Sequence, residues 1–274
     1  MSAPADHVLL YDKPAGSTSH DVVASVRRAL PRKTKVGHAG TLDPFATGLL
    51  LVLVGRATRA QRFFMALPKR YEVVARFGAV SSTGDPEGEI TETGRVPAGE
   101  LILPTGLIRQ RPPAYSAVKV GGRRAYQLAR AGAEVQLDER EVTVSRFEQL
   151  WHDGDRRGFV IECSSGTYVR SLIADLGDAY CLALRRTRIG DFDVADADPQ
   201  RPVALSEALS FLPEVALDGD TARRAAHGVR VDAPAAGERG DAVVVRLTDD
   251  DGLIALAEPV DGGAGLKPVV GFRG

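Results

Sequence analysis

Runs of hydrophobic and polar positions along the chain predict several strands. Residues 8–11 (VLLY) have the pattern of a short strand, and Pro14 marks its end because proline cannot join a central ladder. Residues 48–54 (GLLLVLV) form a continuous apolar run bounded by glycines, which is typical of a strand buried on both faces. Further strands are predicted at residues 71–77, 141–150, 158–163 and 183–192.

Three segments have helical periodicity. Residues 22–30 carry an apolar stripe behind capping side chains at residues 17–19. Residues 56–67 predict a second helix, in which arginines recur at three-residue spacing along one face. Thr167 is predicted to cap a third helix. Because these helices do not alternate regularly with the strands, the sequence predicts an α+β fold with mixed strand pairing.

Two other stretches indicate how the chain is divided. Residues 81–100 are rich in Gly, Glu and Pro and are expected to form an exposed excursion. A boundary is predicted near residue 205, because a β-rich tail follows it, with strands expected at 242–247 and 253–256. We therefore expect a large domain over residues 1–205 and a small one over residues 206–274.

Composition narrows the protein class. Hydrophobic residues make up 44% and charged residues 26%, as in an ordinary globular protein. The N-terminus lacks the pattern of a signal peptide, and no apolar run is long enough to span a bilayer. Two cysteines and five histidines have no metal-ligand spacing, and no nucleotide-binding glycine motif occurs. These features predict a cytoplasmic protein without membrane association, metal or cofactor.

The net charge of −1 hides a strong segregation of charges. Residues 1–80 hold 12 Lys/Arg against 5 Asp/Glu, and residues 111–130 hold five Lys/Arg and no acid. Residues 201–274 are acidic, with 12 Asp/Glu against 8 Lys/Arg. Basic blocks of this kind can form a positive surface for a polyanion. On charge alone, solvated surface faces explain them equally well.

Four residues are candidates for chemistry. Asp43 lies in a glycine-rich loop ahead of a buried strand, although an Asp-Pro turn is the simpler explanation for it alone. Arg170 lies in the first turn of a predicted helix, where a cation opposes the helix dipole, so an anionic partner or a surface position would explain it. Tyr71 and Tyr168 adjoin basic residues and could stack on a base or simply pack in the core.

Six stretches, in this order along the chain, carry a resemblance to a known family. They are residues 12–16 (DKPAG), 37–50 (GHAGTLDPFATGLL), 69–71 (KRY), 110–119 (QRPPAYSAVK), 166–172 (GTYVRSL) and 184–190 (LRRTRIG). Over essentially its full length, the chain resembles the bacterial TruB family of tRNA pseudouridine-55 synthases. Residues 226–228 (AHG) and 265–268 (GLKP) resemble the small PUA-like C-terminal domain of that family.

The resemblance implies the pseudouridine synthase fold, with a mixed, largely antiparallel central sheet flanked by helices. It implies that Asp43 is the catalytic aspartate and that Arg170 pairs with it. Tyr71 matches the tyrosine thought to stack on the target ring and to assist removal of the C5 proton. Asp43 would then be ionised, paired with Arg170 and overlaid by Tyr71.

The resemblance also implies how RNA binds. His38, Tyr168 and Leu184 match positions that line the uridine pocket, and Lys13 and Pro14 match its floor. The basic segment 111–130 falls in an insertion that grips the T-arm of tRNA. The implied enzyme is a monomer that needs no cofactor and no obligatory protein partner, and it isomerises a flipped-out uridine.

Two other functions stay open at this level. An RNA-binding or tRNA-folding role, alone or alongside catalysis, would use the same basic blocks without requiring Asp43. A hydrolase using His38 and Asp43 is a weaker alternative, because the chain lacks a metal-ligand set and a nucleophile elbow.

Overall fold

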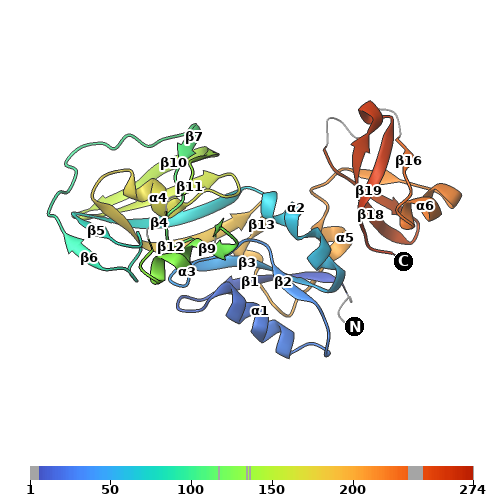
Figure 1. Ribbon diagram of the computed structural model, residues 1–274, viewed down its shortest axis with the longest axis horizontal. Helices are drawn as coiled ribbons and strands as arrows, with labels where there is room; N and C mark the ends of the chain where they lie inside the picture. The colour runs from blue at the N-terminus through green and yellow to red at the C-terminus, as the bar shows by residue number, and fades with distance from the viewer. Residues whose placement is uncertain (1–5, 117, 134, 136, 234–242, 274) are drawn as a thin grey trace.

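The computed structural model describes residues 6–116, 118–133, 135, 137–233 and 243–273. A large sheet, two small hairpins and a second, C-terminal sheet make up its β structure (Figure 1). The strands of the large sheet are β1 (His7–Lys13), β2 (Val36–His38), β3 (Thr47–Val54), β4 (Lys69–Phe77), β7 (Gly106–Gln110), β10 (Arg140–Asp153), β11 (Arg156–Cys163), β12 (Ala179–Ile189), β13 (Phe192–Asp193) and β14 (Val203–Ala204).

Helices are short. They are α1 (Ser19–Arg28), α2 (Gln61–Ala66), α3 (Ala125–Arg130), α4 (Val169–Ala174), α5 (Leu205–Ala208) and α6 (Gly219–Ala226), with the 3₁₀ helices η1 (Gly55–Ala60), η2 (Val194–Asp196) and η4 (Asp261–Gly263). Thr18 and Asp21 form a capping box at the start of α1, as the cluster of capping side chains predicts.

The large sheet has the order β14-β1-β3-β12-β4-β11-β10-β7, with β2 on β3 and β13 on β12. Its pairs are antiparallel except for β3 and β12, which run parallel where Gly48 lies opposite Arg186. The mixed, largely antiparallel sheet is therefore confirmed. The predicted strand over 183–192 has different limits, because β12 begins at Ala179 and a turn at Gly190 separates it from β13.

The predicted burial of the apolar run on both faces of β3 is confirmed. Leu50 and Val52 pack with Val22 of α1 on one face. Leu49, Leu51 and Leu53 share a cluster with Phe64 of α2 on the other. A third cluster lies beyond it, where Leu172 of α4 packs on β4, β11 and β12. The parallel β3–β12 pair thus joins two separately packed halves of the sheet.

Several sequence predictions need correction. Residues 56–67 form η1 and then α2 rather than one regular helix. Thr167 does not cap α4, because its hydroxyl donates to the Ser164 carbonyl and Tyr168 takes the capping position. The excursion at 81–100 is not uniformly exposed: it holds the hairpin of β5 (Ala79–Ser81) and β6 (Ile90–Glu92), and Asp85 within it is buried.

The basic segment forms a hairpin and a helix. Strands β8 (Lys119–Val120) and β9 (Arg123–Arg124) are joined through Gly121 and Gly122, both at positive φ, as the glycine pair predicts. Helix α3 follows directly. This hairpin and α3 lie between β7 and β10, so the segment is an excursion from adjacent strands of the large sheet.

The C-terminal sheet has the order β15-β17-β18-β19-β16. Its strands are β15 (Glu214–Ala216), β16 (Val231–Asp232), β17 (Val245–Asp249), β18 (Gly252–Val260) and β19 (Gly265–Gly271). The strand predicted at 242–247 starts at a residue outside the described chain, and β17 covers its second half. The expected domain boundary near 205 and the PUA-like character of the tail stay predictions.

The arginines spaced along residues 56–67 bind the C-terminal sheet. Arg56 donates to the Phe272 carbonyl, Arg59 donates to the Gly271 carbonyl at 2.7 Å, and Arg62 pairs with Glu258 at 2.7 Å. Leu256 and Phe272 join the apolar cluster around Phe64. Figure 1 shows the C-terminal sheet beside α2 and α5, at the end of the molecule opposite β5 and β6.

Candidate active site

The loop that carries Asp43 is tied down by polar side chains from β1 and α1. The buried Ser19 hydroxyl accepts from the Leu42 amide at 2.9 Å and donates to the Leu42 carbonyl at 3.2 Å. The Lys13 ammonium, fully buried, donates to the Ser17 carbonyl at 2.7 Å and the Pro44 carbonyl at 3.3 Å. Burial lowers the pKa of Lys13, and the Asp43 carboxylate opposes this shift. The backbone on both sides of Asp43 is therefore fixed.

Arg186 supports the same loop from β12. Its guanidinium is buried and donates to the carbonyls of Leu49 at 2.8 Å and Gly40 at 3.1 Å. The Arg186 backbone approaches so closely that a Cβ on Gly48, which has φ +104°, would overlap the Arg186 carbonyl. Glycine at position 48 is what permits the parallel pairing of β3 with β12.

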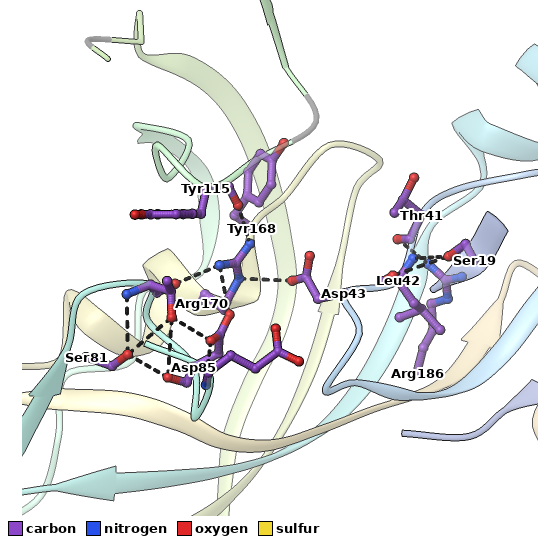
Figure 2. Close-up of polar contacts among 12 residues, drawn as sticks. Ser19, Thr41, Leu42, Asp43, Ser81, Asp85, Tyr115, Tyr168, Arg170 and Arg186 are labelled. Carbon is purple, nitrogen blue, oxygen red and sulfur yellow. Dashed lines mark hydrogen bonds and ion pairs between the residues drawn. The ribbon is translucent and has the colours of Figure 1, made fainter. Parts of the chain in front are cut away.

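Asp43 and Arg170 form an ion pair. Oδ2 of Asp43 lies 2.9 Å from Nε of Arg170, and the second carboxylate on this arginine is Asp85, with Oδ2 3.1 Å from Nη1. Only 4% of the Arg170 side chain is exposed, against 34% for Asp43. Figure 2 shows the guanidinium between the two carboxylates. A buried cation thus holds one carboxylate that solvent reaches and one that is enclosed.

Further hydrogen bonds fix the geometry of this group. Arg170 donates from Nη1 to the Thr83 carbonyl at 2.6 Å and from Nη2 to the Tyr115 carbonyl at 2.8 Å. Asp85 accepts from the Thr83 hydroxyl at 2.5 Å and from the Glu87 amide at 3.1 Å. Both terminal nitrogens of the Arg170 guanidinium thus donate hydrogen bonds to surrounding loops, which restricts the orientation of its side chain.

Asp85 is a site residue that the sequence analysis missed. It lies in the acidic segment that was expected to be exposed, where one buried Asp cannot be told from its solvated neighbours. A weak signal was present in residues 81–85 (SSTGD), because Ser and Thr beside an Asp often hydrogen-bond it in a tight loop. Gly84, at φ +74°, lets the loop pass beside the Arg170 side chain.

Burial and the neighbouring charges shift the pKa of Asp43 in opposite directions. Burial raises the pKa of the Asp43 carboxyl above its ordinary value of 3.8, and the Asp85 carboxylate acts in the same direction. The Arg170 guanidinium lowers the pKa of Asp43 by favouring the ionised form. Removing the positive charge of Arg170 would therefore raise the pKa of Asp43 further.

Tyr71 and Leu184 lie on the neighbouring strands β4 and β12. Tyr71 on β4 is cross-strand partner of Arg186, and Leu184 on β12 is partner of Val73. Burial raises the pKa of Tyr71, whereas the charge of Arg186 and its hydrogen bond to the phenol lower it. Leu184 and Phe45 also border a cavity of about 580 Å³. Arg186 therefore hydrogen-bonds the Tyr71 phenol, and the Asp43 charge acts on the pKa of the same group in the opposite direction.

Tyr168 directly precedes α4, two residues before Arg170. Its ring lies under the Arg140 guanidinium, with the guanidinium carbon 4.7 Å from the ring centroid. Its backbone is held by both ends of the Gln110 amide. Tyr168 is therefore fixed beside the Asp43–Arg170 pair (Figure 2).

His38 and Pro14 occupy more peripheral positions. The His38 ring meets His20 of α1 edge-on, with centroids 5.5 Å apart. Burial and the neighbouring His20 lower the pKa of His38 to about 4, so its ring is neutral at pH 7. Pro14 is exposed, and its carbonyl accepts from Lys13 at 2.8 Å. The structure thus pairs Asp43 with Arg170 and bonds Lys13 to the carbonyl of the adjoining Pro44. Tyr71 and Leu184 share an apolar cluster with the adjoining Leu42, whereas the described contacts of His38 and Pro14 do not include Asp43.

Residues 27–169 match the TruB family pseudouridylate synthase N-terminal domain. A relative from Thermobifida fusca (strain YX), named tRNA pseudouridine synthase B, is 43% identical over 303 residues, covering 98% of this chain and 99% of the relative. The chain belongs to the TruB pseudouridylate synthase family. A relative of the same name from Mycobacterium bovis (strain BCG / Pasteur 1173P2) is 41% identical and covers 100% of this chain and 98% of its own.

Solved structures agree with the family. A chain in a crystal structure of a Cbf5-Nop10-Gar1 complex has a TM-score of 0.65 and 27% identity, covering 93% of this TruB family member and 78% of that chain. A chain in an H/ACA RNP bound to a substrate RNA containing 2'-deoxyuridine has a TM-score of 0.67 and 22% identity, covering 100% and 92%. The pseudouridine synthase fold is therefore confirmed. Among the described residues, no helix is long and apolar enough to cross a membrane.

Proposed function

We propose that this chain is a tRNA pseudouridine-55 synthase with Asp43 as its catalytic carboxylate. Family membership and the names of the full-length relatives support isomerisation of uridine in tRNA. The observation that carries the assignment of Asp43 is its ion pair with the buried Arg170, in which Asp43 alone keeps a solvent-accessible face. A carboxylate placed in this way can reach a substrate while its counter-ion stays enclosed.

The reaction suits these residue types. The N1–C1′ bond of uridine breaks, the uracil turns, and a C5–C1′ bond forms; C5 loses its proton and N1 gains one, without redox change. An ionised carboxylate acts as nucleophile or electrostatic partner at the ribose or the base. Tyr71 stacks on the uracil and assists the departure of the C5 proton, in a pocket whose apolar wall is Leu184.

The remaining residues bind the RNA. Tyr168 lines the uridine pocket, Lys13 and Pro14 support its floor, and His38 stacks within the tRNA loop after the uridine has left its own stack. The exposed Arg123 and Arg124 of the basic hairpin hold the T-arm. The enzyme acts as a cytoplasmic monomer without a cofactor or an obligatory protein partner.

Tritium release from C5-labelled tRNA, with mapping of the product, tests the proposal. Asp43→Asn should lose at least about 1000-fold in turnover, because the amide keeps the shape of the side chain and removes its charge. Asp155→Asn is a matched control, since Asp155 pairs with Arg76 at 3.0 Å in the turn between β10 and β11. An active Asp43→Asn variant, or a product at another position of the tRNA, would contradict the proposal.

The basic hairpin also favours a second function, the remodelling of tRNA. This role needs RNA binding and not Asp43, so the Asp43→Asn protein separates the two. If that variant accelerates the refolding of a misfolded tRNA as well as the wild-type protein does, the folding role stands beside catalysis. If neither protein accelerates refolding, the second function is wrong.

A further inference from the structure

The basic excursion, which is the segment joining β7 to β10, and the last residue of β7 together make three contacts with the start of α4 and the residue before it. The Gln110 side chain binds the backbone of Tyr168. The Ser171 hydroxyl donates to the Arg111 carbonyl at 3.2 Å, and Arg170 donates to the Tyr115 carbonyl at 2.8 Å. Tyr168, Arg170 and Ser171 are thus bonded to the end of β7 and to the first residues of the excursion.

Gln110 makes the most constrained of these contacts. Only 2% of it is exposed, and both ends of its amide are used on one residue. Oε1 accepts from the Tyr168 amide at 2.7 Å, and Nε2 donates to the Tyr168 carbonyl at 2.9 Å. Because Tyr168 precedes the first residue of α4, this paired bond fixes where the helix starts and so where Arg170 points.

The Tyr115 carbonyl bears on Arg170 itself. The guanidinium uses Nε for Asp43, Nη1 for Asp85 and Thr83, and Nη2 for Tyr115. A guanidinium is planar, so a shift of any one partner turns all three nitrogens together. Movement of the excursion at Tyr115 would therefore change the geometry of the Asp43 ion pair.

Further along the basic excursion lies the basic hairpin, formed by β8 and β9. Val120 lies opposite Arg123, and Arg123 and Arg124 are exposed at the turn. Backbone hydrogen bonding continues from this turn into α3, where the Ala125 amide donates to the Val118 carbonyl at 2.7 Å. A polyanion bound at the hairpin could therefore displace this segment, whose first residues are bonded to Arg170.

We infer that RNA binding at the basic excursion is coupled to the orientation of Arg170. Gln110 is the positioning residue: by fixing the start of α4, it holds the ion pair between Arg170 and Asp43. The inference rests on the proposed function only for the nature of the polyanion. Coupling of this kind is a free energy shared between two sites, so it is tested by perturbing one site and measuring the response at the other.

Hydrogen–deuterium exchange tests the coupling without catalysis. When a T-arm stem-loop RNA binds the wild-type protein, exchange should slow at the hairpin, residues 119–124, and also at residues 168–174. In Gln110→Met, which keeps the volume and removes both amide bonds, slowing should persist at the hairpin and be lost at 168–174. Unchanged exchange at 168–174 in the wild-type protein on binding would overturn the inference.

Single-turnover rates at saturating RNA provide the second test. Arg123→Ala should slow the wild-type rate about 5- to 10-fold and should have no further effect in Gln110→Met, because the coupled path is already broken. Gln110→Met alone should lower the rate at unchanged RNA affinity and move the acid limb of the pH profile upward, since Asp43 loses part of its contact with Arg170. Independent, multiplying effects of the two substitutions would overturn the inference.

Gln149→Met is the control, because Gln149 bonds Arg157 in the far half of β10. It should leave the single-turnover rate and the pH profile as in the wild-type protein. Failure of the proposed function has a different signature, namely wild-type protein that binds RNA and forms no pseudouridine. The exchange experiment decides the coupling in either case.

Discussion

Nε of Arg170 lies 2.9 Å from Oδ2 of Asp43, which joins the first turn of α4 to the loop after β2. A cation in the first turn of a helix opposes the helix dipole at a cost of up to about 1 kcal/mol. Charge-assisted hydrogen bonds contribute about 1.5–3 kcal/mol each, so the two carboxylates on Arg170 outweigh that cost. The position of Arg170 is thus explained by its partners and not by helix stability.

Asp85 should affect turnover although, unlike Asp43, it is buried and not accessible to a substrate. Asp85→Asn keeps an oxygen for the Thr83 hydroxyl and the Glu87 amide, but it replaces the charged oxygen that accepts from Arg170 with an amide nitrogen that cannot accept. We expect turnover to fall about 10- to 100-fold with little change in RNA affinity, because the arginine loses one of its two anionic anchors. Steady-state kinetics and RNA-binding titrations measure the two effects separately.

Asp178→Asn is the control for that experiment, since Asp178 pairs with the exposed Arg95. It should leave turnover unchanged. Wild-type turnover in Asp85→Asn would show that Asp43 and the backbone carbonyls alone are enough to orient Arg170.

The sequence predicted the Asp43–Arg170 pair and could not predict Asp85. The pair was implied by the family resemblance, because an Asp-Pro turn explains Asp43 alone more simply and a surface position also explains Arg170. Asp85 gains its role from burial, and burial depends on the hydrogen bond from the Cys181 amide to the Gly84 carbonyl at 3.0 Å. That contact joins distant segments and leaves no periodic pattern.

Arg186 illustrates the same limit. As one of several arginines in residues 184–190, it has nothing in sequence to mark it as buried. In the fold it becomes cross-strand partner of Tyr71 because β12 pairs with both β3 and β4. The expectation that Tyr71 overlies Asp43 did not include Arg186 as a partner of Tyr71. The continuous apolar run of β3 and the alternating pattern of β4, by contrast, were sufficient to predict which faces are buried.

Asp43→Asn should stabilise the folded protein at neutral pH. The pKa of Asp43 is raised in the folded protein, so the native state binds protons more tightly than the unfolded state, and stability falls as pH rises from the unfolded pKa to the folded one. An amide has no such dependence. Thermal unfolding at pH 7 should therefore give Asp43→Asn the higher Tm, with the difference shrinking toward pH 4. A lower Tm at pH 7 would show that the Arg170 contact outweighs the burial of the charge.

Gly48→Ala should prevent stable pairing of β3 with β12. A Cβ at this position overlaps the Arg186 backbone, which two strands hold in place, so we expect a loss of at least about 4 kcal/mol in unfolding free energy. Gly121→Ala is the control: it also has positive φ but open space around it, and should cost only about 1–2 kcal/mol. Urea unfolding of both variants measures the difference. Equal losses would mean that backbone conformation, and not overlap with Arg186, requires glycine at position 48.

Arg59→Ala should weaken the attachment of the C-terminal sheet. Loss of the bond to the Gly271 carbonyl is expected to cost about 1 kcal/mol and lower Tm by about 2–4 °C. Arg223→Ala removes an exposed pair with Asp220 and should leave Tm close to that of the wild-type protein. Equal shifts in the two variants would show that the bond from Arg59 adds nothing measurable to the contacts of Arg56, Arg62 and Phe272.

RNA affinity should depend steeply on salt. Each phosphate neutralised by Lys or Arg releases counter-ions, so the logarithm of the association constant falls linearly with the logarithm of salt concentration. Arg123→Ala should reduce that slope by about 1, because Arg123 is exposed at the turn of the basic hairpin. Arg62→Ala is the control, since Arg62 is paired with Glu258 and should leave the slope unchanged. Binding titrations with tRNA from 50 to about 200 mM salt measure the slopes. A flat profile for the wild-type protein would exclude phosphate contacts as the main source of affinity, and an unchanged slope in Arg123→Ala would place the RNA away from the hairpin.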